Sequence, residues 1–93
     1  MKLNLYSIFD RKMNIYLTPF PARGEVDACR QISASFGDAS MKQTPVGTNP
    51  GDFDLIHVGY FDDEMGDITK VMPLVIGNIA VIVGNSSSST VPS

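Results

Sequence analysis

The amino-acid sequence predicts an α+β domain in which an antiparallel sheet of four or five strands packs one helix on a face, in the order β-β-α-β-β. Three observations support this fold class. Side chains alternate with the two-residue period of a strand in the N-terminal part of the chain, and the second half holds further apolar segments of strand length. The middle of the chain holds one segment with helical spacing. The 93 residues are enough for one domain only, and one helix covers one face of such a sheet.

The N-terminal part of the chain predicts a β-hairpin. Residues 3–9 and 13–17 each alternate in side-chain character, and the polar segment Asp10-Arg11-Lys12 joins them. A short polar link between two such segments is typical of an antiparallel hairpin. Pro19 and Pro21 are expected to end it, because proline cannot donate a backbone hydrogen bond to a neighbouring strand.

One helix is expected over residues 23–36. Glu25 and Asp27 lie near its start, where the helix dipole favours negative charge, and Gly37 follows as a typical stop signal. Residues 38–52 have no period and contain four prolines or glycines, so they are expected to form a long loop. The expected buried stripe of the helix recurs every three or four residues and consists of Val26, Cys29, Ile32 (or Ser33) and Phe36.

The second half of the chain predicts two further strands, at residues 53–61 and 68–76, joined by the acidic turn 62–67. Gly77-Asn78 then precedes a second apolar segment, residues 79–83. Gly-Asn is typical of a type II′ hairpin turn, which would make 79–83 a separate fifth strand. The alternative is one bulged strand that runs through both segments.

The end of the chain is polar and rich in serine. Residues 85–93 are expected to form a disordered tail. Residues 1–84 then make up a single α+β domain.

Both faces of the predicted sheet are apolar. The first strand places Leu5 and Phe9 on one side and Tyr6 and Ile8 on the other, and the segment 79–83 has no polar face. One helix cannot cover both sides, and an exposed apolar face of this size promotes association. Self-association is therefore expected. The alternative is that the loop 38–52 folds over the second face.

The residue types that perform catalysis are few and isolated. Cys29 is the only cysteine, which excludes an internal disulfide and a zinc–cysteine cluster, and its place on the helix predicts a small buried side chain. The single histidine, His57, is expected to share a strand face with Leu55, Gly59 and Phe61 in a structural role.

Two further motif searches also give no catalytic centre. The acidic segment 62–67 lacks the spacing of a calcium-binding loop and is expected to be a solvated turn, and the glycines match no phosphate-binding loop. No enzyme activity, metal or cofactor is expected.

The sequence predicts an intracellular protein. The N-terminus lacks the charged-then-apolar pattern of a signal peptide. The longest nearly continuous apolar segment, residues 71–83, is shorter than the ~20 residues that span a bilayer. No membrane partner is therefore expected.

Charge is distributed unevenly along the chain. Residues 1–51 hold six basic and four acidic residues, a net charge of +2, whereas residues 52–93 hold one basic and six acidic residues, a net charge of −5. Basic side chains beside exposed aromatic rings are typical of proteins that bind single-stranded nucleic acid. The alternative is that the basic residues form a solvated face over core aromatics. The candidate nucleic-acid-binding residues are Lys2, Arg11, Lys12, Arg23, Arg30 and Tyr16.

An ordered set of short motifs links the sequence to a viral family. Tyr6-Ser7-Ile8-Phe9-Asp10 is followed by Tyr16-Leu17-Thr18-Pro19-Phe20, then by a strand over residues 52–62, then by Gly66-Asp67-Ile68 and Pro73-Leu74-Val75-Ile76. The set covers residues 4–78. It resembles the small nonstructural protein of gokushovirus-type microviruses, which are small phages with circular single-stranded DNA genomes.

The resemblance implies a non-enzymatic accessory protein in the cytoplasm of the infected bacterium. Such a protein would modulate replication or packaging of the single-stranded DNA genome, by weak single-stranded DNA binding as a homo-oligomer or through phage or host replication proteins. The net charge of −3 argues against tight, nonspecific DNA binding. The alternative is a protein-interaction module, an assembly helper or a host-factor inhibitor, without contact to nucleic acid.

Overall fold

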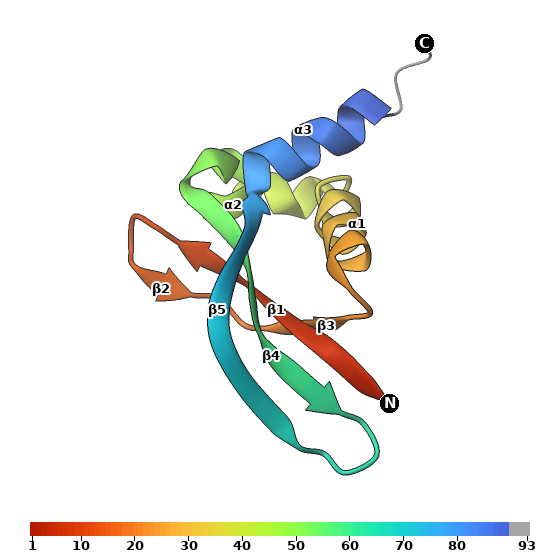
Figure 1. The fold of residues 1–93 in the computed structure, drawn as a ribbon. Coiled ribbons are helices and arrows are strands. Elements are labelled where there is room, and N and C mark those ends of the chain that lie inside the picture. Colours follow the sequence, from red (N-terminus) through yellow and green to blue (C-terminus); the bar gives the residue numbers. More distant parts are fainter. Residues whose placement is uncertain (90–93) are drawn as a thin grey trace.

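A computed structural model describes residues 1–89, with side chains described as far as Gly84, and it contains a five-stranded antiparallel sheet with all helices on one side (Figure 1). The predicted α+β class is therefore confirmed. The strands are β1 (Lys2–Asp10), β2 (Ile15–Tyr16), β3 (Phe20–Ala22), β4 (Phe53–Asp62) and β5 (Ile68–Asn78). The helices are α1 (Glu25–Ser35), α2 (Pro45–Thr48) and α3 (Ile79–Ser89), with 3-10 turns η1 (Ala39–Gln43) and η2 (Pro50–Asp52).

The sheet has the strand order β2-β1-β4-β5, and β3 also pairs with β1. The predicted first hairpin is confirmed, with its second strand shortened to β2. The strand that follows was not predicted: Pro21 lies in β3, opposite Leu5 of β1. Proline is tolerated there because β3 lies at an edge of the sheet, where a donor is not needed on both sides.

Helix α1 lies within the predicted range, but one residue of its predicted buried stripe is wrong. Ala28 and Ile32 are buried against the sheet, and Cys29 and Phe36 pack at the margin of the core. Val26 is instead 69% exposed. A spacing of three to four residues fits several adjacent stripes of a helix, and the position of the sheet decides which stripe is buried.

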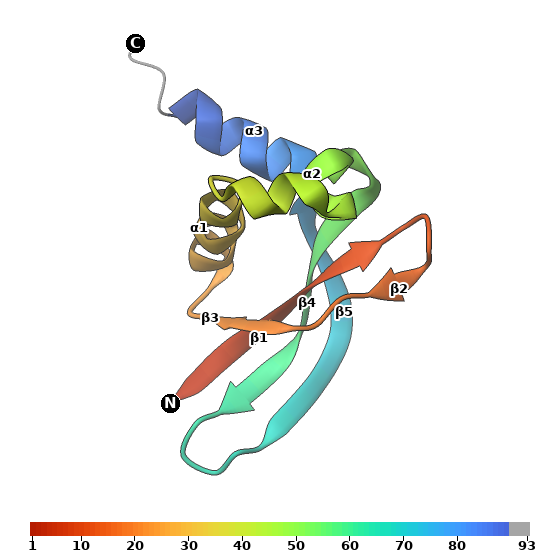
Figure 2. The same ribbon diagram turned by 180° about the vertical axis from the view of Figure 1, so that it is seen from behind.

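The expected long loop at residues 38–52 is wrong, because this segment folds into η1, α2 and η2. The side chains of Asp38 and Thr44 cap the first two of these turns by accepting hydrogen bonds from the backbone N–H groups of Ser40 and Gly47. The segment lies on the same side of the sheet as α1 (Figure 2), and Val46 joins the core there. It therefore does not cover the second face of the sheet. The expectation of a single helix is also wrong.

The expected hairpin at Gly77-Asn78 and the separate strand at 79–83 are also wrong. Strand β5 continues to Asn78, and α3 begins at Ile79. The Asn78 carboxamide oxygen accepts a hydrogen bond from the Ala80 N–H at 3.0 Å, which is the geometry of a helix N-cap. Asparagine is favoured both in tight turns and at N-caps, so the residue type did not distinguish them. The expected tail 85–93 overlaps the end of α3, and residues 90–93 lie outside the described residues.

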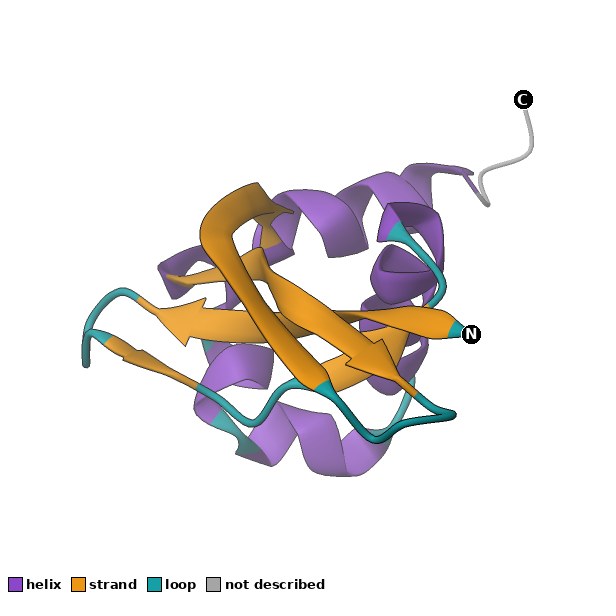
Figure 3. Cartoon of the chain, turned by 60° about the horizontal axis from the view of Figure 1, so that its bottom comes forward, coloured by secondary structure: helices purple, strands orange, loops and turns teal. Residues whose placement is uncertain are grey.

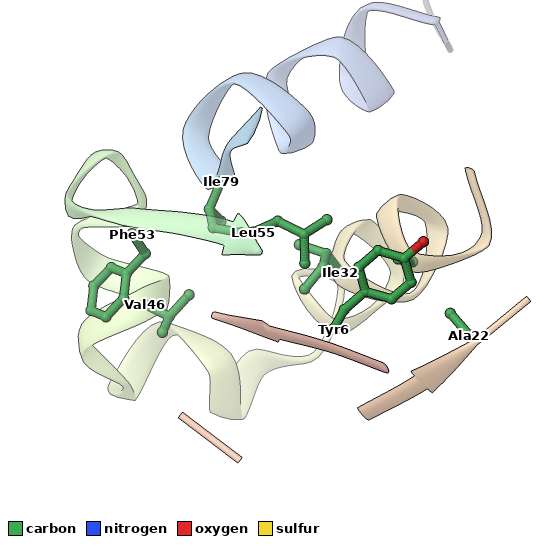
Figure 4. Packing of buried hydrophobic residues seen from close by; sticks show 8 residues of the cluster. Tyr6, Ala22, Ile32, Val46, Phe53, Leu55 and Ile79 are labelled. Carbon is green, nitrogen blue, oxygen red and sulfur yellow. The ribbon is translucent and has the colours of Figure 1, made fainter. Parts of the chain in front are cut away.

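The core lies between the sheet and the helices. Leu55 of β4 and Ile79 of α3 are completely buried at its centre. Figure 4 shows how side chains from strands and helices meet there. The helices α1, α2 and α3 and the strands β1, β3 and β4 contribute to one cluster, which consists of Tyr6, Ala22, Ala28, Ile32, Val46, Phe53, Leu55 and Ile79.

Replacing Asn78 by alanine is expected to lower the free energy of unfolding by about 1–3 kcal/mol. The Asn78 amide donates to the carbonyl oxygens of Gly51 and Phe53, so the change removes these bonds together with the cap of α3. Urea denaturation measures the loss. Asn49→Ala is the matched control, because the exposed Asn49 amide contacts only the neighbouring Thr48 hydroxyl among the described side chains. Equal losses in both variants would contradict the role given to Asn78.

Candidate functional site

The face of the sheet that points away from the helices, here called the open face, holds an apolar hollow. Figure 3 shows this side of the sheet in front of the helices. The hollow has a volume of about 360 Å³. Its lining is mostly apolar and includes Leu5, Val58, Ile68 and Pro73, together with Tyr16 and Lys70. The expected apolar second face is therefore confirmed.

A β-bulge at Val58 shapes this hollow. In the pairing of β1 with β4, Leu5 lies opposite Gly59 and Tyr6 lies opposite His57, so Val58 has no partner. The pairing of β4 with β5 shifts at the same place, where residues 71–73 have no register partner. Bulges bend a strand and increase its twist. Strand β5 accordingly curves along the sheet (Figure 1), and Val58, Gly59 and Pro73 line the hollow at this place.

Gly59 lets β5 approach at the floor of the hollow. A Cβ atom on Gly59 would lie 2.4 Å from the Thr69 carbonyl oxygen, which is too close for any side chain. Glycine in a strand often marks such a close approach of two backbones.

The hollow combines an aromatic ring with a positive charge. The Tyr16 side chain is 50% exposed, and its ring packs on Phe9 with the ring centroids 4.7 Å apart. Lys70 of β5 is exposed and lines the same hollow. A supported, half-exposed ring in the same hollow as a lysine provides a surface on which a flat ring can stack while an anion is held in the hollow.

The other candidate residues on the first strand and its turn lie outside the hollow. Lys2 begins β1, opposite Asp62. Arg11 is held by the sheet, because its guanidinium donates to the Gly51 carbonyl and its Nε lies 3.5 Å from a carboxylate oxygen of Asp54. Lys12 lines a separate small pocket at the end of the sheet, together with Asp10 and Asp52.

The candidates around the helix are equally dispersed. The Arg23 backbone N–H donates to the Asp27 carboxylate, and the Arg23 carbonyl accepts from the Asn4 amide, at the connection between β3 and α1. Arg30 is exposed on α1. Of the six candidates, only Tyr16 lines the hollow. Lys70 lines the hollow but was not among the residues predicted to bind nucleic acid. One signal in the sequence was available, because Lys70 is the only lysine or arginine in residues 52–93.

His57 lies on the helix side of the sheet with Leu55, as expected, but the expectation that Gly59 shares this face is wrong. Its ring lies between Tyr6, with centroids 5.2 Å apart, and Tyr60, with centroids 5.1 Å apart. The bulge moves Gly59 to the open face, so regular alternation does not hold along β4. Among the described side chains, the His57 Nε2 atom is buried without a hydrogen-bond partner. The ring is therefore part of an aromatic cluster.

Cys29 has the properties of a packing residue. Its side chain packs against the core cluster. Burial raises the pKa of the Cys29 thiol, and the negative charge of Glu25 raises it further. A raised thiol pKa lowers the thiolate fraction and hence the nucleophilicity.

The acidic turn 62–67 is organised by its own backbone. The Asp62 carboxylate accepts hydrogen bonds from the backbone N–H groups of Glu64 and Met65, which lowers the pKa of Asp62. The Asp63 carboxylate lies 3.0 Å from the amino group of Met1. Within residues 1–89, no group of three or more His, Cys, Asp or Glu side chains is placed to hold a metal ion, and no helix is long and apolar enough to cross a membrane.

Comparison with known proteins places the chain in a viral family. A family model described as Phage ORF5 protein matches residues 3–82, which include all five strands and α1. The chain belongs to the Phage ORF5 protein family. This phage ORF5 family member is 32% identical over 84 residues to "Protein ORF5" of Chlamydia phage 1, a match that covers 88% of this chain and 83% of that protein. No solved structure matches this chain. The predicted relationship to small phage proteins is therefore confirmed.

Replacing Gly59 by alanine is expected to destabilise the protein by about 1–3 kcal/mol, because the new methyl group overlaps the Thr69 carbonyl and forces β4 and β5 apart. Thermal denaturation measures the change. Gly51→Ala is the matched control, since a Cβ atom there meets nothing within 4 Å. An unchanged melting temperature for Gly59→Ala would contradict the close approach at the floor of the hollow.

The contribution of Asp62 to stability is expected to depend on pH. The pKa of Asp62 is lowered in the folded protein, so its stabilising effect is complete above the ordinary value of 3.8 and disappears as the pH falls through the lowered pKa. The stability difference between the wild type and Asp62→Asn should therefore be largest near neutral pH and shrink in acid. Urea denaturation across this pH range measures it. Asp67→Asn is the matched control, because it removes a charge from the same turn and leaves the capping carboxylate of Asp62 in place.

Proposed function

We propose that this phage protein is a non-enzymatic accessory protein that binds single-stranded DNA weakly in the open-face hollow and modulates replication or packaging of a single-stranded DNA genome inside the infected bacterium. The observation that carries the proposal is that Tyr16 and Lys70 line one apolar hollow. These two groups match the two parts of a nucleotide, the flat base and the anionic phosphate.

The aromatic part of the hollow suits an unpaired base. Phe9 supports the Tyr16 ring from one side, and half of the Tyr16 side chain remains exposed. Pro19 and Pro73 add rigid apolar surface to the same lining. Stacking depends on the face of a base rather than on its hydrogen-bonding edge, so binding would show little sequence preference.

The electrostatics make the interaction weak. The hollow holds one lysine, and the net charge of the chain is −3. Arg11, which the sequence favours as a phosphate contact, is already engaged by Asp54 and Gly51. Few phosphates are therefore neutralised, and the salt dependence of binding should be shallow.

The apolar character of the lining favours a second candidate, a segment of another protein. An extended peptide with apolar side chains would bury Leu5, Val58 and Ile68 without a need for positive charge. In this case the protein would be an interaction module, such as an assembly helper or a host-factor inhibitor.

Fluorescence anisotropy with a labelled oligothymidine tests the DNA proposal. Saturable binding is expected at about 50 mM salt, with weaker binding at about 200 mM. Tyr16→Ala should reduce the affinity by about tenfold, the effect of losing one stacked base, and Lys70→Glu should also reduce it. Tyr60→Ala and Lys42→Glu are matched controls, because Tyr60 packs on His57 on the helix side and Lys42 lies in η1. Both controls should bind like the wild type.

Two further sets of charge reversals test the candidate residues that the sequence predicts. Of the neighbouring candidates Arg11 and Lys12, only Lys12 is changed to glutamate. A glutamate at position 11 would place a second negative charge beside Asp54 and could disturb the fold there. Reversal of Asp62 and Asp63 should not weaken binding. The absence of saturable binding at about 50 mM salt would remove the DNA proposal. A photo-crosslinking residue at position 16 in infected cells would then identify the occupant, since a protein adduct supports the second candidate.

A further inference from the structure

Strand β5 is a long apolar edge of the sheet. It follows β4 at the end of the strand order, and within residues 1–89 no other strand pairs with its outer side. Its eleven residues include large apolar side chains with high exposure: Ile68 at 72%, Met72 at 87%, Leu74 at 60% and Val75 at 61%. An exposed edge of this length and composition is a template for pairing with another strand.

The exposed side chains of β5 lie on both faces of the sheet. Leu74 pairs with His57, which packs among rings on the helix side, whereas Val75 pairs with Ile56, the next residue of β4. Because successive residues of a strand point to opposite faces, Leu74 and Val75 are exposed on opposite sides. A partner packed on one face would leave the other exposed. Only a strand that continues the sheet covers both.

Two strands of a second copy could pair with this edge: its own β5, or the opposite edge of its sheet. The second copy's β5 is the better match. That opposite edge consists of β2 and β3, which have two and three residues, so β5 would find few partners there. Two β5 strands match in length, and a strand paired antiparallel with its own copy closes a two-fold dimer.

The acidic residues before β5 also favour the antiparallel orientation of the two β5 strands. Asp62, Asp63, Glu64 and Asp67 lie in the turn directly before β5. A parallel arrangement would place the acidic turns of two copies side by side, whereas the antiparallel one separates them to opposite ends. Lys70 is the only charged residue of β5 itself.

We infer that β5 pairs antiparallel with β5 of a second copy about a two-fold axis, so that two five-stranded sheets join into one continuous sheet. Pro73 lies where the register between β4 and β5 is interrupted, so the outer pairing uses the residues on either side of it. The test of the inference leaves the hollow intact, because Leu74 and Val75 are not part of its lining.

The molar mass of the full chain in solution tests the inference. Size-exclusion chromatography with light scattering at micromolar concentration should give twice the mass of 10.1 kDa. Leu74→Lys and Val75→Lys should each raise the dimer dissociation constant by about tenfold or more. Val26→Lys on α1 and Val81→Lys on α3 are matched controls, since these side chains are 69% and 57% exposed on helices and should leave the dimer intact.

Hydrogen exchange locates the interface. The outward amides of residues 68–78 should exchange slowly in the wild-type dimer and faster in Leu74→Lys, with circular dichroism verifying that the variant is folded. A single-chain mass for the wild type, open-ended assemblies, or a dimer that survives both β5 changes would overturn the inference. Oligothymidine binding by the monomeric variant is read separately, so failure of the dimer and failure of DNA binding are distinguishable.

Discussion

The unpaired Val58 in the middle of β4 interrupts two ladders at once, and several features of the molecule follow from this one residue. On one side of it, His57 lies with the aromatic rings on the helix side. On the other, Gly59 contributes to the open face. The strand bends at this point, and β5 bends with it. Without the bulge, the open face would lack the curvature that places Lys70 and Tyr16 around one hollow.

A small chain with a one-sided core has little capacity to bury both faces of a sheet. Chains of this length bury only about 60–65% of the surface that they expose when unfolded. Here α1, α2 and α3 all lie on one side, and the core cluster with Leu55 and Ile79 at its centre uses their apolar residues. The opposite face and the β5 edge remain available for association. The proposed binding in the hollow and the inferred self-association thus have a common origin in the placement of the helices.

The basic residues that are grouped in the first half of the sequence are separated in the folded chain. The sequence places six basic residues in the first half, but Lys2 begins β1 and Arg11 follows its other end. The exposed Arg11 side chain contacts Asp54 of β4 and Gly51 of η2. Residues that are close in the sequence are therefore not close on one surface. Membership of the Phage ORF5 protein family identifies the chain as a phage protein.

Local patterns determined much of the fold: the two-residue period predicted β1, apolar segments of strand length predicted β4 and β5, and the helical spacing predicted α1. The apolar character of both strand faces predicted an uncovered side. These patterns are readable because each depends on neighbours along the chain. Tertiary structure alone decided the rest. Asn78 caps a helix rather than forming a turn because its amide reaches Gly51 and Phe53. Tyr16 and Lys70 line one hollow beside the bulge in β4. Contacts between residues separated by dozens of positions leave no local period in the sequence.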